Sequence, residues 1–268
     1  MITRVLIDGV PSDGRIPVTD SSVLRGDGCF EVLKAYGGRP FALEEHLDRL
    51  AASARALGIG LPERSSLADW ISKVSAELVD GAVRVIVTRG SSVPDLDEPS
   101  RVIVFGHLWG RDIGPGRLLP VVAPWHAAGV DWELAGAKVL SYAPNMAASR
   151  RAVSEGYEDA LLVTIEGVVL EGPTFSLGWV VDGRLETPSL SLGILDSITR
   201  RLVLAIADEI GLEVVEGSWR LSRLDSATEV SAWSTIREVQ PVVAVGERTW
   251  NPGPITKRIG SVFAARVG

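Results

Sequence analysis

Lysine is scarce in this chain, and one lysine lies in a segment that favours nucleophilic chemistry. Four of the 27 basic residues are lysines, and Lys138 lies in the stretch Ala135-Gly136-Ala137-Lys138-Val139-Leu140-Ser141-Tyr142, which carries no other charge. Apolar surroundings favour the neutral amine, the form that attacks an aldehyde. A lysine whose stem packs on apolar surface while its ammonium group reaches water is the alternative for this segment taken alone.

Two later segments contain groups that could bind a charged ligand. Glu171-Gly172 follows an expected hairpin through Glu166-Gly167, where the carboxylate could also be an ordinary turn residue in water. Ser197-Ile198-Thr199 begins an expected helix that ends before Gly211. Free N–H groups, hydroxyls and the positive end of the helix dipole suit a phosphate there, although the same residues would also make an ordinary N-cap.

The composition and the motifs argue against several classes of protein. The net charge is −7 with the two signs interspersed, so nucleic acid is not an expected partner. Cys29 is the only cysteine, which agrees with a reducing compartment. No Gly-x-Gly-x-x-Gly stands between a strand and a helix, which argues against a nucleotide-binding fold. His46, His107 and His126 are too far apart to form a zinc site, so no metal is predicted.

The apolar segments do not favour a membrane protein. No uninterrupted apolar run approaches the roughly 20 residues that span a bilayer. Residues 1–7 alternate like a strand and lack the basic start, apolar stretch and cleavage site of a signal peptide. A cytoplasmic protein without a membrane partner is therefore predicted.

Strands and helices are expected to mix along the whole chain, in an α+β fold. Leu43, Leu47 and Leu50 recur at helical spacing, which predicts a helix over residues 43–57. Glycine and proline cluster at 110–116 and predict a small N-terminal domain (1–112), a linker (113–116) and a larger C-terminal domain (117–268). The other predicted helices are 67–79, 145–155, 198–210 and 254–267, and the predicted strands are 1–7, 30–36, 82–88, 101–108, 118–123, 159–165, 175–181, 213–216, 228–232 and 242–245.

Six blocks in order make the chain resemble the fold-type IV pyridoxal-phosphate enzymes, the class that contains branched-chain and D-amino-acid aminotransferases, (R)-amine transaminases and aminodeoxychorismate lyase. The resemblance runs nearly end to end. The blocks are Gly26-Asp27-Gly28-Cys29-Phe30-Glu31, Glu45-His46-Leu47-Asp48-Arg49-Leu50, Lys138 with Tyr142, Leu170-Glu171-Gly172, Gly193-Ile194-Leu195 with Ile198-Thr199-Arg200, and Ser234-Thr235 with Pro241. It implies pyridoxal 5'-phosphate as the cofactor, bound mainly by the larger C-terminal domain, and a homodimer.

The resemblance also implies a role for each matched residue. Lys138 is matched to the Schiff-base lysine, Arg49 to the phosphate-binding arginine and Glu171 to the carboxylate that pairs with the pyridine nitrogen. Tyr142 lies where relatives often place a tyrosine beside the ring. The remaining residues assigned to the cofactor are Thr174, Leu195, Ile198, Thr199, Ser234 and Thr235, and Phe30 is assigned to the substrate.

Three departures from the family pattern bear on the substrate. The block after Glu171 reads Gly172-Pro173-Thr174-Phe175-Ser176, where relatives run through small polar residues to Asn. Residues 91–96 lack the Arg and His with which D-amino-acid aminotransferases grip the substrate carboxylate, so that specificity is disfavoured. Arg25 occupies a position that is often aromatic in relatives, and our hypothesis is that it binds a substrate carboxylate; an exposed loop arginine is the alternative.

The expected activity is transamination between a small amine or amino acid and a keto acid. Aminodeoxychorismate lyase would share the cofactor and the removal of the Cα proton but would expel pyruvate, and cofactor-binding residues do not separate these outcomes. A regulatory relative without turnover is a third possibility, against which Lys138, Glu171 and Arg49 argue.

Overall fold

The computed structural model describes residues 2–91, 99–108 and 114–267. The chain divides into two compact units: the first unit comprises Met1–Arg111 and Ala137–Tyr142, and the second comprises Asp112–Gly136 and Ala143–Gly268. Both units mix helices with sheets, which confirms the predicted α+β class. The predicted domain boundary at 112 and the start of the predicted linker at 113 lie outside the described residues.

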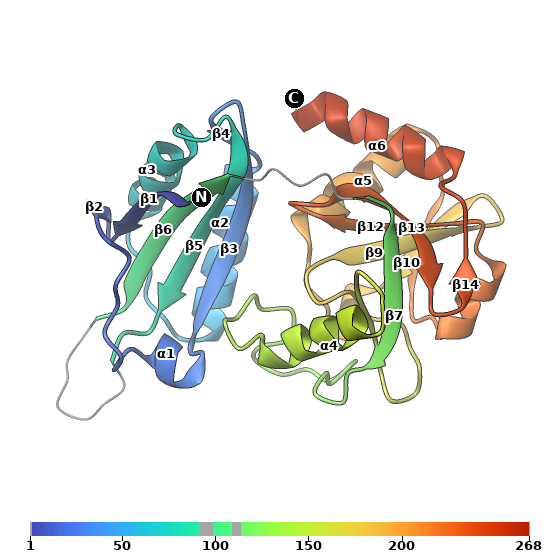
Figure 1. Cartoon of the computed structure of the whole chain (residues 1–268), viewed down its shortest axis with the longest axis horizontal. Coiled ribbons are helices and arrows are strands. Elements are labelled where there is room, and N and C mark those ends of the chain that lie inside the picture. Colours follow the sequence, from blue (N-terminus) through green and yellow to red (C-terminus); the bar gives the residue numbers. More distant parts are fainter. Residues whose placement is uncertain (1, 92–98, 109–113, 268) are drawn as a thin grey trace. The chain divides into compact units, whose positions relative to one another are not determined.

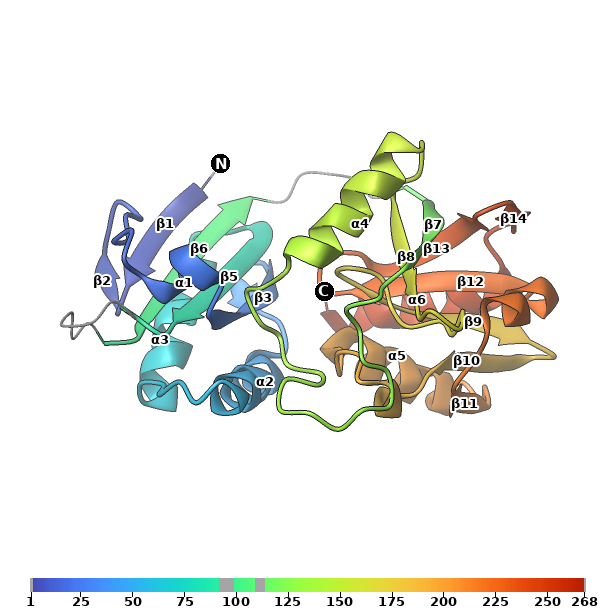
Figure 2. The ribbon, with the colours of Figure 1, turned by 90° about the horizontal axis from the view of Figure 1, so that it is seen from below.

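The first unit is an antiparallel sheet with helices on one face (Figures 1 and 2). Its strand order is β2-β1-β6-β5-β3-β4. Alternate residues of the central strands, such as Leu33 and Val85, join the apolar faces of α2 and α3 in one core, because strand side chains alternate between faces. The elements are β1 (Ile2–Ile7), β2 (Val10–Pro11), α1 (Ser21–Arg25), β3 (Gly28–Tyr36), β4 (Arg39–Pro40), α2 (Leu43–Ala56), α3 (Arg64–Ser75), β5 (Asp80–Thr88) and β6 (Arg101–Leu108).

Residues 137–142 extend the edge of this sheet beside the beginning of β3. Val139 pairs with Cys29 in an antiparallel bridge, the N–H of Phe30 donates to the carbonyl of Lys138 (3.0 Å), and Leu140 donates to the carbonyl of Gly28 (2.8 Å). The sequence analysis placed Lys138 in the second domain. These backbone hydrogen bonds join its segment to the first unit instead.

The second unit is a mixed sheet with helices and apolar cores on it. Its strand order is β11-β10-β9-β12-β13-β7-β8, with β14 paired to β13. Trp233 and Val180 pack with α5 and α6 in one core, whereas Trp179 and Val181 face a second core, and α4 packs on β7 and β8. The elements are β7 (Gly116–Val122), α4 (Ala143–Ser154), β8 (Asp159–Val163), β9 (Ser176–Val181), β10 (Arg184–Pro188), α5 (Ile198–Glu209), β11 (Val214–Gly217), β12 (Glu229–Ser234), β13 (Glu238–Val245), β14 (Arg248–Thr249) and α6 (Pro254–Val267).

Strand β10 is absent from the sequence-based prediction, and its composition explains why. Residues 184–188 read Arg-Leu-Glu-Thr-Pro, a segment with one aliphatic residue and a terminal proline, yet Glu186 is buried. Its carboxylate accepts hydrogen bonds from the indole of Trp179 (2.9 Å) and from Arg223 (2.6 and 2.9 Å). Partners distant in sequence therefore stabilise a buried charge that local composition disfavours. Within the described part of the chain, no helix combines the length and hydropathy of a membrane span.

Candidate active site

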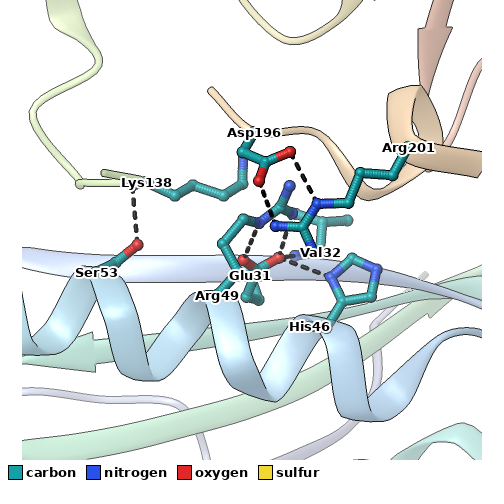
Figure 3. Close-up of polar contacts among 8 residues, drawn as sticks. All are labelled: Glu31, Val32, His46, Arg49, Ser53, Lys138, Asp196 and Arg201. Carbon is teal, nitrogen blue, oxygen red and sulfur yellow. Dashed lines mark hydrogen bonds and ion pairs between the residues drawn. The ribbon is translucent and has the colours of Figure 1, made fainter. Parts of the chain in front are cut away.

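Lys138 lies among aromatic rings of the first unit. Its Nζ is 4.4 Å from the ring centroid of Phe30 and 5.6 Å from that of Tyr142, and the two rings meet edge to face at 5.2 Å. Its backbone N–H donates to Ser53 Oγ on α2 (3.0 Å), a contact drawn in Figure 3. The backbone of Lys138 is thus fixed, and its amine is half-buried over aromatic surface. The first unit therefore brings together Phe30, Lys138 and Tyr142, three residues that the sequence analysis assigned to the substrate or the cofactor.

A buried ionic cluster lies on α2 and β3, as Figure 3 shows. Glu31 Oε1 accepts a hydrogen bond from Arg49 Nε (2.7 Å), and Oε2 accepts one from Arg49 Nη2 (2.8 Å) and lies 2.8 Å from His46 Nδ1. Burial alone would raise the pKa of Glu31, but the charge and hydrogen bonds of Arg49, with His46, hold it well below its usual range. Burial lowers the pKa of His46, against the opposing effect of Glu31. The carboxylate therefore fixes the orientation of the arginine matched to phosphate binding.

Two arginines of the first unit are candidates for a substrate carboxylate. Arg25 ends the short helix α1 and is exposed. Arg84 lies on β5 with its guanidinium carbon 5.8 Å from the ring centroid of Phe30, and burial lowers its pKa. No carboxylate pairs with Arg84 within the residues described. Phe30 is therefore flanked by both the Lys138 amine and a guanidinium that lacks an anion.

Glu171 is held by the backbone of the second unit. Its Oε1 accepts a hydrogen bond from the N–H of Leu195 (3.1 Å), and its carbonyl accepts one from Leu162 (2.9 Å). Gly172, the next residue, lies against the ring of Phe175: a Cβ at Gly172 would be 2.1 Å from that ring. Thr174, assigned to the cofactor from sequence, is exposed, whereas Phe175 is buried.

The beginning of α5 leaves backbone donors available. Ser197 is the N-cap, and its Oγ accepts from Arg200 N (3.3 Å). Ile198 and Thr199 are buried, yet their N–H groups meet no acceptor among the residues that the structure covers. Asp196 pairs with Arg201 (Figure 3). Free N–H groups at a helix N-terminus form an anion site.

A second set of donors lies in the turn between β12 and β13. Ser234 ends β12, and its Oγ accepts from Arg237 N (3.1 Å). The N–H groups of Thr235 and Ile236 have no acceptor in the described ranges. Glu238 closes the turn at φ +54°, a left-handed conformation that non-glycine residues rarely adopt. Because α5 packs on β12, both sets of donors belong to one packed region of the second unit.

Each unit, taken by itself, carries groups that suit pyridoxal phosphate. In the second unit, the turn between β12 and β13 and the beginning of α5 supply N–H donors and hydroxyls of the kind that bind a phosphate dianion. The first unit carries Arg49, whose guanidinium is also suited to phosphate. The ring nitrogen requires an anionic acceptor, and Glu171 is a carboxylate held by a backbone N–H. The aldehyde requires an amine, and Lys138 lies on an aromatic surface.

Sequence reasoning did not assign Glu31, His46 or Arg84 to the candidate site, where the structure places them beside assigned residues. The first two could have been found: Glu31 is a carboxylate in an apolar strand, and His46 and Arg49 are three residues apart on a helix, which places them on one face. Arg84 gave no such signal, because arginine alternating with valine is equally typical of an exposed strand face.

Comparisons with known proteins agree with this chemistry. The family model for class IV amino-transferases matches residues 28–245. A putative branched-chain-amino-acid aminotransferase of Methanocaldococcus jannaschii is 32% identical over 262 residues, covering 94% of this chain and 91% of the relative. The D-alanine aminotransferase of Listeria monocytogenes is 29% identical, covering 95% and 92%.

A solved structure shares the whole fold. The PLP-bound form of a hypothetical aminotransferase from Mycobacterium tuberculosis superposes with a TM-score of 0.90 at 26% identity, covering 99% of each chain. The family match extends over most of the sequence and includes the Lys138, Glu171 and Thr199 segments. The chain belongs to the class IV aminotransferases, enzymes that depend on pyridoxal phosphate.

Proposed function

We propose that this enzyme transfers an amino group between an amino acid and a keto acid, with Lys138 as the residue that attaches the cofactor. The observation that carries the proposal is the position of the Lys138 amine over Phe30. This ring also lies beside the guanidinium of Arg84, which pairs with no carboxylate of the described residues. The named relatives support it, since they are called branched-chain and D-alanine aminotransferases.

Each residue has a distinct task in this reaction. When bound, pyridoxal phosphate supplies an aldehyde that accepts amino groups and a ring that withdraws electrons from the substrate Cα. The Lys138 amine would attach the cofactor, and the amino group of the donor would displace it. The freed Nζ would then be the base that removes the Cα proton of the donor. Glu171 would accept a hydrogen bond from the protonated ring nitrogen, which would keep the ring electron-poor. Thr199, Thr235 and Arg49 hold the phosphate.

Arg84 favours a substrate that bears a carboxylate. A guanidinium that is partly desolvated, and that has no anion among the residues described, gains a charge-assisted, bidentate hydrogen bond when a carboxylate binds. We expect Arg84→Met to raise the KM for amino acids by at least about tenfold. Activity on 1-phenylethylamine, which has no carboxylate, should change far less. Arg25→Met tests the hypothesis from the sequence that Arg25 binds the substrate carboxylate. An equal rise in the KM for amino acids in that variant would assign carboxylate binding to Arg25 as well.

The attachment site is tested by reduction. Borohydride treatment of the holoenzyme followed by peptide mass mapping should place the pyridoxyl label on Lys138. Lys138→Ala should lose the label, whereas Lys73→Ala should keep it, because Lys73 is exposed on α3 and pairs with Asp69. A label on another lysine would refute the proposal.

Donor incubations separate transaminase from lyase. A transaminase converts its cofactor to pyridoxamine phosphate when given a donor without an acceptor, whereas aminodeoxychorismate lyase releases pyruvate from its own substrate. A panel of L-amino acids, D-amino acids and (R)- and (S)-1-phenylethylamine then gives stereochemical preference. The sequence analysis used residues 91–96 against D-amino-acid specificity, and of these residues 92–96 lie outside the described residues. The homodimer stays a prediction, and measurement of the molar mass by light scattering would test it.

A further inference from the structure

Arg237 joins three separate segments of the second unit. Its Nη2 donates to Asp159 Oδ2 (2.7 Å) and its Nη1 to Gln240 Oε1 (2.8 Å). Its guanidinium carbon lies 4.6 Å from the ring centroid of Phe175. The side chain is 15% exposed, and a mostly buried guanidinium with three such partners has a single defined orientation.

The partners of Arg237 are themselves fixed. Asp159 begins β8, its side chain is 9% exposed, and its other oxygen accepts from Ser149 Oγ (2.7 Å) and Ala160 N (2.9 Å). Gln240 Nε2 donates to the carbonyl of Gly114 (2.5 Å). The guanidinium is therefore bound to Asp159 of β8, which Ser149 links to α4, and to Gln240 of β13.

The residues that Arg237 positions are those assigned to the cofactor. It lies in the turn that carries Thr235, and that turn closes on Glu238 in a left-handed conformation that the surrounding structure must maintain. The aromatic ring beneath its guanidinium belongs to Phe175, whose carbonyl accepts from Gly172 N (2.7 Å), one residue after Glu171. The contact thus links the Thr235 turn to the Glu171 segment.

We propose that Arg237 is a positioning residue, which holds the Thr235 turn against Phe175 so that the N–H groups of Thr235 and Ile236 are directed at the cofactor phosphate. This inference rests on the proposed role of Thr235. Loss of the guanidinium should release the turn and weaken binding of the phosphate, while attachment of the aldehyde to Lys138 continues.

The test compares cofactors with and without phosphate. Apoenzyme is titrated with pyridoxal 5'-phosphate and with pyridoxal, and the two Kd values are measured by absorbance. Arg237→Met should raise the Kd for pyridoxal phosphate about tenfold and change that for pyridoxal less than about twofold. Arg237→Lys should recover little, because an ammonium cannot form the paired hydrogen bonds. Arg151→Met, an exposed arginine of α4 paired with Glu155, is the matched control and should change neither value.

Asp159→Asn provides an independent approach to the same contact. It should also raise the Kd for pyridoxal phosphate selectively. The double variant should bind pyridoxal phosphate no more weakly than the single variants, because both substitutions break the same contact. Equal weakening of both ligands would mean a merely structural role, and unchanged binding would also overturn the inference. If Arg237→Met does not fold, the Kd values of Asp159→Asn for pyridoxal phosphate and for pyridoxal decide the question in the same way. Failure of the proposed function is separate, since it would appear as absence of the borohydride label on wild-type Lys138.

Discussion

Replacing Glu31 by glutamine should destabilise the first unit severely although the two side chains have the same shape. Both carboxylate oxygens accept from Arg49, at 2.7 and 2.8 Å, so an amide nitrogen in either position faces a donor. The exposed fractions of Glu31, His46 and Arg49 are 1%, 2% and 9%, and water cannot replace the lost acceptor. Leaving one member of a buried ion pair unpaired costs about 3–5 kcal/mol.

The assay is urea unfolding of the apoprotein, with hydrogen exchange of α2 and β3 to assign the change to the first unit. Glu44→Gln is the matched control, because Glu44 lies on the same helix and pairs with Arg64 at the surface, where the interaction is screened. Its free energy of unfolding should change far less. A Glu31→Gln variant as stable as the control would refute the argument that the buried pair is energetically coupled.

The same variant should alter the acid limb of the stability curve. The native pKa of Glu31 is lowered from the ordinary 4.5, so the unfolded chain binds a proton in a range where the native chain does not. The stability that Glu31 contributes is complete above pH 4.5 and is lost as the pH falls below it. The curves of the wild type and Glu31→Gln should therefore converge on acidification.

Three further changes test other parts of the structure. The native pKa of His46 is lowered from 6.5, so stability should fall as the pH drops below that value, and His46→Gln should flatten this slope in urea titrations at pH 5 to 7.5. Gly172→Ala should cost about 1–3 kcal/mol in thermal unfolding and weaken cofactor binding, because its Cβ would meet the Phe175 ring at 2.1 Å; an unchanged melting temperature would contradict that packing. Ser197→Ala should cost about 1 kcal/mol by the same assay, since Ser197 caps α5, and no loss would mean that the cap contributes nothing.

Local pattern was sufficient for the elements with strong periodicity. Helix α6 (Pro254–Val267) and strand β6 (Arg101–Leu108) begin and end at the predicted residues. Helix α3 begins at Arg64, three residues before its prediction, because Arg64 and its neighbours are polar and carry no apolar period. The apolar period of an element is a property of its own residues, so it can be recognised without knowing which segments pack against it.

The family and the cofactor could be inferred from the sequence because six blocks, including the segments of Lys138, Glu171 and Thr199, resemble those of a known family in the same order. Only the tertiary structure showed that Glu31 pairs with Arg49, that the Lys138 segment joins the sheet of the first unit, and that Arg237 meets Asp159, 78 residues earlier. These contacts depend on how distant segments pack, and a buried charge is stable only where folding brings it a partner.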